Sequence, residues 1–175
     1  MSILDQFPIW WLRSGRYWWS RLRRRLFERR YLSTALPPVN SLEEIEACLK
    51  KVKWTMDGPL HLYDCISYPQ TVWARKKDDC DGFAILAAKL LLCWAPDTNP
   101  VLVTAIVSPL QLSHTICAFR YGDSFMFFDN NYLRKGSFQK YIDMVNQFTK
   151  SAERLICWDV IKPDTLEMLE FHVRR

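Results

Sequence analysis

Residues 73–92 read WARKKDDCDGFAILAAKLLL, and this stretch decides the fold. Asp78 and Asp79 can cap a helix that runs from about Cys80 to Cys93. Such a helix would be apolar nearly all round, which is typical of a helix in the centre of a domain rather than on its surface. The stretch therefore predicts a buried central helix with a cysteine in its first turn.

The residues downstream of this helix favour strands. Val101 to Val107 is rich in β-branched residues, and His114 to Tyr121 and Ser124 to Asp129 flank Gly122-Asp123, a two-residue hairpin signal. Further along, we expect a helix over Phe138 to Phe148 and a strand over Arg154 to Ile161. Helices followed by hairpin-linked strands predict an α+β fold, with the central helix packed on an antiparallel sheet.

Upstream, the chain divides into three parts. Residues 9–31 have the spacing of an amphipathic helix, with Trp and Leu on one side and most of the Arg on the other. Ser33 to Asn40 reads as a linker, and Ser41 with Glu44 forms a capping box at the start of another helix. We therefore expect a basic Trp/Arg-rich arm over 1–32, a linker over 33–40 and a catalytic domain over 41–175, with 55–69 irregular.

The net charge of +5 belongs to the arm. Residues 1–31 hold eight Arg against only Asp5 and Glu28, so the remaining residues carry a slight net negative charge. No apolar run is long enough to predict a transmembrane helix, and no secretory signal is visible. Six cysteines without a CxxC pair favour a reducing compartment, so we expect a cytoplasmic protein or a component of a larger assembly. Four cysteines read as core residues: Cys48, Cys93, Cys117 and Cys157.

Cys80 is the candidate nucleophile. The first turn of a helix favours a thiolate, because the helix dipole and unpaired N–H groups stabilise negative charge. The neighbouring aspartates oppose this, so the thiolate needs a cationic partner. Among the three histidines, His61 lies in an irregular segment and His172 near the C-terminus. His114 opens a strand of the sheet that would pack on the central helix, which makes it the candidate base.

The hairpin register supplies a third residue. If Gly122-Asp123 is a two-residue loop, Asp129 falls opposite Ile116 and on the same face as His114, with Cβ atoms roughly 5–8 Å apart. A carboxylate there can orient one imidazole nitrogen while the other points to the thiol. Taken singly, a buried spectator cysteine, a structural histidine and a turn-capping aspartate are the competing interpretations. A zinc site from these residues lacks the usual local ligand spacing.

At this point the sequence resembles the transglutaminase-like cysteine peptidases of papain-like fold, most closely the bacterial transglutaminase-like cysteine proteinases. The resemblance covers roughly residues 41–160 and rests on three blocks. Residues 73–92 look like the family's cysteine block, residues 113–119 (SHTICAF) like its histidine strand, and residues 127–130 (FFDN) like its closing strand. The N-terminal arm is not part of the family pattern.

The resemblance implies a Cys80–His114–Asp129 triad, with the Cys80 N–H as one oxyanion donor and Gln70 or Trp73 as candidates for the second. Some bacterial members bind calcium through acidic residues that flank the cysteine, and Asp79 and Asp81 occupy those places. Helix capping and solvation are the competing roles for them. No other cofactor is implied.

Two functions follow as expectations. The first is a thiol-dependent acyl-transfer enzyme, chiefly a cysteine peptidase or amide hydrolase (a thiol protease) acting on a peptide or protein amide, with transfer to another amine as a variant. The alternative is a catalytically inactive transglutaminase-like binding or scaffold module, anchored through its arm. The arm fits a protein partner, packing on its own domain with the Trp side inward, or an anionic membrane surface; nucleic acid is the weaker fit.

Overall fold

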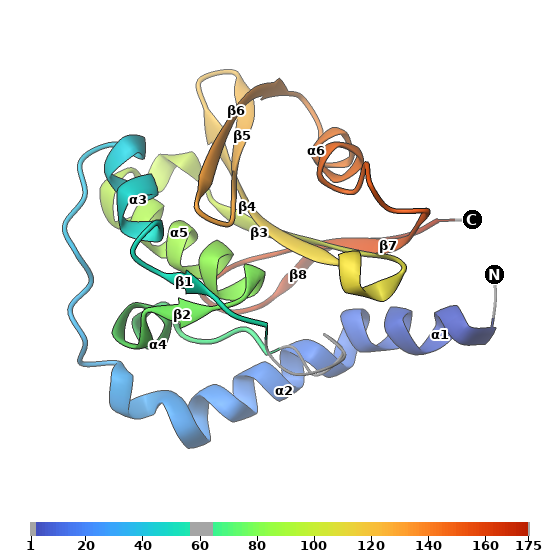
Figure 1. Cartoon of the computed structure of the whole chain (residues 1–175), viewed down its shortest axis with the longest axis horizontal. Helices are drawn as coiled ribbons and strands as arrows, with labels where there is room; N and C mark the ends of the chain where they lie inside the picture. Colours follow the sequence, from blue (N-terminus) through green and yellow to red (C-terminus); the bar gives the residue numbers. More distant parts are fainter. Residues whose placement is uncertain (1–2, 57–64, 175) are drawn as a thin grey trace.

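The computed structural model describes residues 3–56 and 65–174. Within them, the main sheet has six antiparallel strands in the order β6-β5-β4-β3-β7-β8 (Figure 1). Their bounds are β3 Val101–Ser108, β4 His114–Tyr121, β5 Ser124–Asp129, β6 Tyr132–Phe138, β7 Arg154–Ile161 and β8 Met168–Val173. The predicted α+β layout is thus confirmed, with two strands, β6 and β8, that the sequence analysis did not predict.

Helix α5 (Cys80–Trp94) packs on β4. Its buried residues belong to one hydrophobic core, which also takes in Cys117 and Phe119 from β4. Helix α6 (Tyr141–Phe148) covers the other face, where Met144 and Val145 pack with Ile116 and Ala118 from the same strand. Since successive residues of a strand point to opposite faces, odd-numbered positions at the start of β4 face α5 and even-numbered positions face α6.

The predicted hairpin is confirmed in its register. Tyr121 pairs with Ser124 and Cys117 with Phe128, as a two-residue loop requires. Gly122 has a φ of +62°, the left-handed conformation that this type of turn demands and that glycine adopts without strain. This register fixes which side chains of β4 and β5 share a face.

Shorter elements surround the start of α5. The predicted cap of α3 (Leu42–Leu49) is present, since the Ser41 side chain accepts a hydrogen bond from the Glu44 N–H. The parallel pair β1 (Lys53–Trp54) and β2 (Lys77–Asp78) leads into α5. Helix α4 (Pro69–Arg75), which lies partly in the stretch predicted to be irregular, packs on α5. Of the four cysteines predicted to be buried, Cys93 is exposed, because it lies in the last turn of α5 on its outer side.

The N-terminal segment is helical from Ile3 to Tyr31 and lies along the outer edge of the molecule (Figure 1). It comprises α1 (Ile3–Trp10), a π-helical turn (Trp11–Gly15), α2 (Arg16–Arg23), a second π-helical turn (Arg24–Glu28) and a 3₁₀ turn (Arg29–Tyr31). Its buried stripe repeats every four residues: Leu12, Arg16, Ser20, Arg24 and Glu28. A four-residue spacing drifts by about 40° per step on an α-helix, and the wider π turns take up that drift.

One of the interpretations of this helix, packing on its own domain with the Trp side inward, was wrong. Packing on its own domain would have put the Trp side inward and the Arg side in solvent. The structure instead buries Arg16 and Arg24 and exposes Trp18 and Trp19. The reason is that the helix meets several polar groups of the domain, which charged guanidinium and carboxylate side chains can bond together, whereas an indole ring offers a single N–H donor. Leu12 and Tyr17 join the same hydrophobic core as α5.

Between this helix and α3, residues 34–40 run without regular structure, where the linker was predicted. No helix among the described residues is long and apolar enough to cross a membrane.

Candidate functional site

His114 and Asp129 lie together at the ends of adjacent strands. The His114 Nε2 and Asp129 Oδ1 atoms are 2.9 Å apart, a hydrogen-bonding distance. Both side chains are partly exposed, at 19% and 23%. Arg134 of β6 donates to the other carboxylate oxygen at 3.3 Å. The same-face proximity that the hairpin register predicts for these two residues is therefore present.

The electrostatics of this pair favour an ionised carboxylate. Burial alone would raise the pKa of Asp129, but the hydrogen bond and charge of His114, together with Arg134, hold that pKa below its ordinary value. An ionised Asp129 accepts from Nε2 and leaves Nδ1 of His114 as the ring atom available to a third group. The pair thus has the arrangement of a base and its orienting carboxylate.

The imidazole lies on the face of the sheet that α6 covers. His114 shares this face with Ile116, and its ring meets Phe148 edge-on at 5.8 Å between centroids. The next residue, Thr115, points to the other face and is 1% exposed. The position of His114 as the first residue of β4 therefore decides its surroundings.

Cys80 is the first residue of α5, as the sequence predicts. Asp79 caps the helix, since its side chain accepts a hydrogen bond from the Asp81 N–H at 3.1 Å. The thiol lies where the helix dipole favours negative charge, and the residue is 5% exposed. Since α5 packs on the face opposite to α6, the structure brings His114 and Asp129 together and places Cys80 at the end of a helix on the other side of β4.

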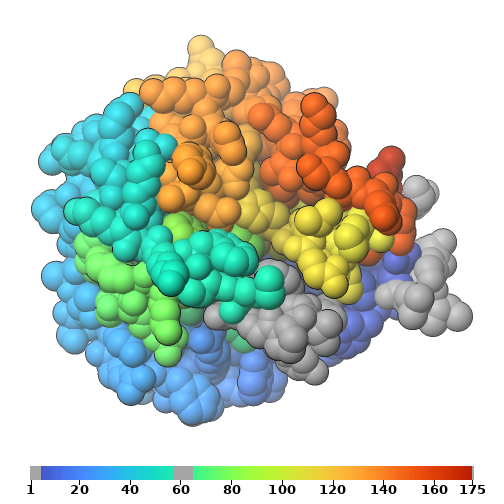
Figure 2. All heavy atoms as spheres, in the orientation of Figure 1, coloured from blue at the N-terminus to red at the C-terminus, as the bar shows by residue number. Residues whose placement is uncertain are grey.

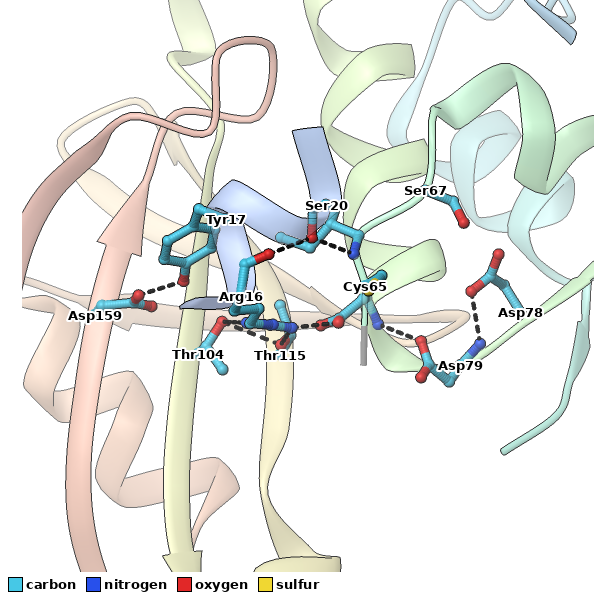
Figure 3. Close-up of polar contacts among 12 residues, drawn as sticks. Arg16, Tyr17, Ser20, Cys65, Ser67, Asp78, Asp79, Thr104, Thr115 and Asp159 are labelled. Carbon is cyan, nitrogen blue, oxygen red and sulfur yellow. Dashed lines mark hydrogen bonds and ion pairs between the residues drawn. The ribbon is translucent and has the colours of Figure 1, made fainter. Parts of the chain in front are cut away.

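Arg16 fills the space between the start of α5 and the sheet (Figure 3). Its guanidinium forms an ion pair with Asp81 of α5, and the two side chains are 3% and 0% exposed. It also donates to Thr104 Oγ1 of β3 at 2.9 Å and approaches Thr115 Oγ1 of β4 at 3.4 Å. Thr104 and Thr115 are bonded to each other at 3.1 Å. A single arginine thus joins the N-terminal helix, α5 and two strands.

Tyr17 extends this network to β7. Its hydroxyl donates to Asp159 (Figure 3). Burial raises the pKa of Asp159 to about 7, although the hydrogen bond from Tyr17 and the charge of Arg16 lower it. Burial, followed by the charge of Asp159, raises the pKa of Tyr17 well above its ordinary value. We call Arg16, Tyr17, Asp81, Thr104, Thr115 and Asp159 the Arg16 cluster.

The C-terminal half of the same helix holds the chain that leads into α4. Arg24 donates to the Ile66 and Ser67 carbonyls at 2.9 and 2.7 Å. Glu28 accepts from the Tyr68 N–H at 2.7 Å and from Thr71 Oγ1 at 3.0 Å. Burial lowers the pKa of Arg24 to about 10, so this guanidinium remains charged at neutral pH. These bonds satisfy backbone groups that would otherwise be buried without partners.

Gln70 and Trp73, the oxyanion candidates, both lie on α4, which packs on α5. Both side chains are half-buried. The ammonium group of Lys76 lies over the face of the Trp73 ring, and this ring packs against the hydrophobic core that includes α5. They are therefore neighbours of the helix that bears Cys80, and their role in binding an oxyanion stays a prediction.

The calcium candidates have other partners in the structure. Asp79 caps α5 and Asp81 pairs with Arg16, so a protein cation already stands beside one of the two carboxylates. In residues 3–56 and 65–174, no group of three or more His, Cys, Asp and Glu side chains is placed to hold a metal ion. Calcium binding at Asp79 and Asp81 stays a prediction with this competing interpretation.

Of the other two histidines, the structure describes His172 alone. His172 is exposed on β8, where it stacks on Trp158 at 4.2 Å and contacts Glu170. His61 lies outside the described residues.

Sequence reasoning missed the Arg16 cluster. Its one available signal was the four-residue spacing of polar residues along the N-terminal helix, which resembles a solvated face. No protein-family model matches this chain, and neither does any curated protein. The resemblance to transglutaminase-like cysteine peptidases consequently rests on the three sequence blocks alone.

Proposed function

We propose that this protein is a thiol-dependent acyl-transfer enzyme of the transglutaminase-like cysteine peptidase type, acting on a peptide or protein amide. The observation that carries the proposal is the hydrogen bond between His114 Nε2 and Asp129 Oδ1 at 2.9 Å. A partly exposed imidazole held by an ionised carboxylate is the arrangement that a general base needs. The position of Cys80 at the first turn of a buried helix supports it as the nucleophile.

The reaction would run through a thioester. His114 Nδ1 takes the thiol proton, and the Cys80 sulfur attacks the amide carbonyl. The C–N bond then breaks as the imidazolium returns the proton to the leaving amine. Water, deprotonated by the same imidazole, attacks the thioester, the C–S bond breaks, and the carboxylic acid leaves with the thiol restored. The Cys80 N–H, with Gln70 or Trp73, would bind the oxyanion.

This mechanism sets a geometric condition. The thiol at the start of α5 and the imidazole at the start of β4 must meet at the end of the strand, although they belong to opposite faces of the sheet. In the structure, Arg16 bonds both Asp81 in the first turn of α5 and Thr115 of β4, which points to the face opposite to His114. This observation favours the second candidate function, a catalytically inactive module of the same fold that binds a partner.

Thiol reactivity separates the two functions. The alkylation rate of each cysteine by iodoacetamide would be measured from pH 5 to pH 9 by mass mapping, with exposed Cys93 as the ordinary thiol within the same molecule. For the enzyme, we expect Cys80 to react faster than Cys93 below pH 7. His114→Ala should lower the Cys80 rate by roughly tenfold or more, since it removes the cation that stabilises the thiolate.

His172→Ala is the matched control, because it removes the other described imidazole, which lies on β8. It should leave the Cys80 profile unchanged. If Cys80 reacts at the same rate with and without His114, the ion pair does not exist and the binding module becomes the better interpretation.

A further inference from the structure

The outward side of the N-terminal helix carries large apolar side chains in solvent. Trp10 is 56% exposed and Trp18 is 62% exposed, although tryptophan side chains are on average highly buried in folded proteins. The exposed apolar residues of this segment are Phe7, Trp10, Trp18, Trp19, Leu26 and Phe27. A contiguous row of this kind on a folded domain marks an interaction surface.

The tryptophans are arranged as a continuous apolar groove. Trp10, Trp11, Trp18 and Trp19 line it together with the small residues Ser14 and Gly15. Trp10 and Trp11 lie 6.4 Å apart, and Trp18 and Trp19 6.1 Å apart, between ring centroids. A Cβ atom on Gly15 would lie 2.7 Å from the Trp11 ring, so the glycine lets that ring lie flat against the helix.

The charge on this side has one sign. Five arginines of the segment are exposed: Arg13, Arg21, Arg25, Arg29 and Arg30. Its two carboxylates are buried and bonded inward, Asp5 to Arg154 at 2.8 Å and Glu28 to the Tyr68 N–H at 2.7 Å. The outward surface of residues 5–31 therefore presents arginine and indole groups with no exposed carboxylate between them.

The helix is held so that this side stays outward. The Arg16 cluster fixes its middle and the Arg24 and Glu28 contacts fix its second half. At about 1.5 Å per residue, the segment from Ile3 to Tyr31 is a ridge roughly 40 Å long. It forms the lower rim of the molecule in Figures 1 and 2. A long convex ridge can contact a flat surface along its whole length.

We propose that this ridge binds the surface of an anionic lipid bilayer, with the helix lying in the plane of the interface. Indole rings partition to the boundary between headgroups and acyl chains, and arginines beside them pair with lipid phosphates and carboxylates while their stems stay in the apolar layer. A duplex nucleic acid would use the arginines but leave the groove of four tryptophans without a role. The proposal is independent of whether Cys80 is catalytic.

Sedimentation with vesicles tests the proposal on the full chain. Phosphatidylcholine vesicles would be compared with vesicles that contain phosphatidylserine, at low and at physiological salt. We expect tighter binding to the anionic vesicles and weaker binding at higher salt. Trp10→Ser with Trp18→Ser should lower partitioning by roughly tenfold or more, because the apolar anchor is removed.

The arginine variant tests the charge separately. Arg25→Gln with Arg29→Gln should lower partitioning into anionic vesicles roughly 25-fold, at about fivefold for each basic residue near the surface, and should leave binding to neutral vesicles unchanged. Trp54→Ser removes an exposed tryptophan outside the segment, and Lys51→Gln with Lys150→Gln removes two exposed cations elsewhere. These two controls should bind like the parent protein, and circular dichroism should show that all variants are folded.

Several results would overturn the proposal. One is equal binding to neutral and anionic vesicles, and another is an equal loss in the control variants. A third is tight binding to duplex DNA that depends on Arg25 and Arg29 and displaces the vesicles, together with parent-like behaviour of the Trp10 and Trp18 variant. In that case the ridge would be a nucleic-acid surface.

Discussion

Two polar clusters lie on opposite faces of the sheet, where both include a residue of β4, and they differ in burial. On the α5 face, Arg16 and Asp81 are 3% and 0% exposed and bonded among hydroxyl groups. On the α6 face, His114 and Asp129 are several times more exposed and open to a further partner. Both contain a basic side chain and a carboxylate in contact, so composition alone does not distinguish them.

This difference in burial indicates which cluster can take part in proton transfer. A charge buried as deeply as Arg16 must keep its partner, because losing it leaves an ion without solvation. Such a cluster specifies where the N-terminal helix sits. A partly solvated pair can gain or lose a proton and change partners at small cost. We therefore interpret the Arg16 cluster as structural and the His114–Asp129 pair as the candidate functional group.

The largest expected effect is at Arg16. Arg16→Met keeps an unbranched apolar stem but leaves Asp81 buried without its cation, and should lower the free energy of unfolding by about 3–5 kcal/mol. Arg16→Met with Asp81→Asn should recover part of this loss, because the unpaired charge is gone. Urea denaturation measures both, and Arg25→Met, at an exposed position of the same helix, should change stability by less than about 0.5 kcal/mol.

If Arg16→Met lowers the free energy of unfolding by less than about 1 kcal/mol, the two clusters do not differ in this way, because the buried pair then contributes no more than a typical exposed one.

Asp159 gives a smaller effect with a distinctive pH dependence. Its pKa is raised by burial from an ordinary 3.8 to about 7, so between these values the folded state holds a proton that the unfolded state has released. The free energy of unfolding should therefore fall as the pH rises from about 4 to about 7, by at most about 1.4 kcal/mol per pH unit for one proton. Above pH 7 this contribution becomes constant.

Asp159→Asn should remove that slope, because the amide cannot titrate and still accepts the hydrogen bond from Tyr17. The measurement is urea denaturation from pH 4 to pH 8, with Asp97→Asn at an exposed position as the control. If the difference in stability between Asp159→Asn and the parent stays constant over this range, Asp159 is ionised in the folded protein throughout.

The elements that sequence could predict are those with local signals. The central helix, the Ser41 cap and the hairpin register follow from residues close together in the chain. From that register came the proximity of His114 and Asp129, which needs only the two-residue period of a strand. Edge strands β6 and β8 were missed because they are mostly solvated, with weak alternation.

The Arg16 cluster and the face occupied by His114 could not be predicted in this way. Residues 115–119 of β4 are buried on both faces, so alternation does not say which face α5 covers. Similarly, a polar residue at every fourth position of a helix, as at Arg16, Ser20 and Arg24, has the pattern of a solvated side until the polar groups opposite it are known. Both depend on contacts between residues far apart in the chain, 65 positions for Arg16 and Asp81 and 34 positions for His114 and Phe148.

The smallest expected effect on stability is at Asp129, and it tests most directly whether the His114–Asp129 pair differs from the Arg16 cluster. Asp129→Asn should lower the free energy of unfolding by less than about 1 kcal/mol at neutral pH, because the pair that it breaks is partly solvated. The pKa of Asp129 is lowered in the folded state, so this small contribution is present above the ordinary pKa of an aspartate and is lost as the pH falls through the lower folded value.

The same substitution should nevertheless reduce the Cys80 alkylation rate near neutral pH if His114 is the base, because the imidazole loses its orienting carboxylate. Asp143→Asn, at an exposed position on α6, is the control and should change neither quantity. If Asp129→Asn lowers the free energy of unfolding by several kcal/mol and leaves the thiol reactivity unchanged, the His114–Asp129 pair is a structural contact between neighbouring strands, as the Arg16 cluster is.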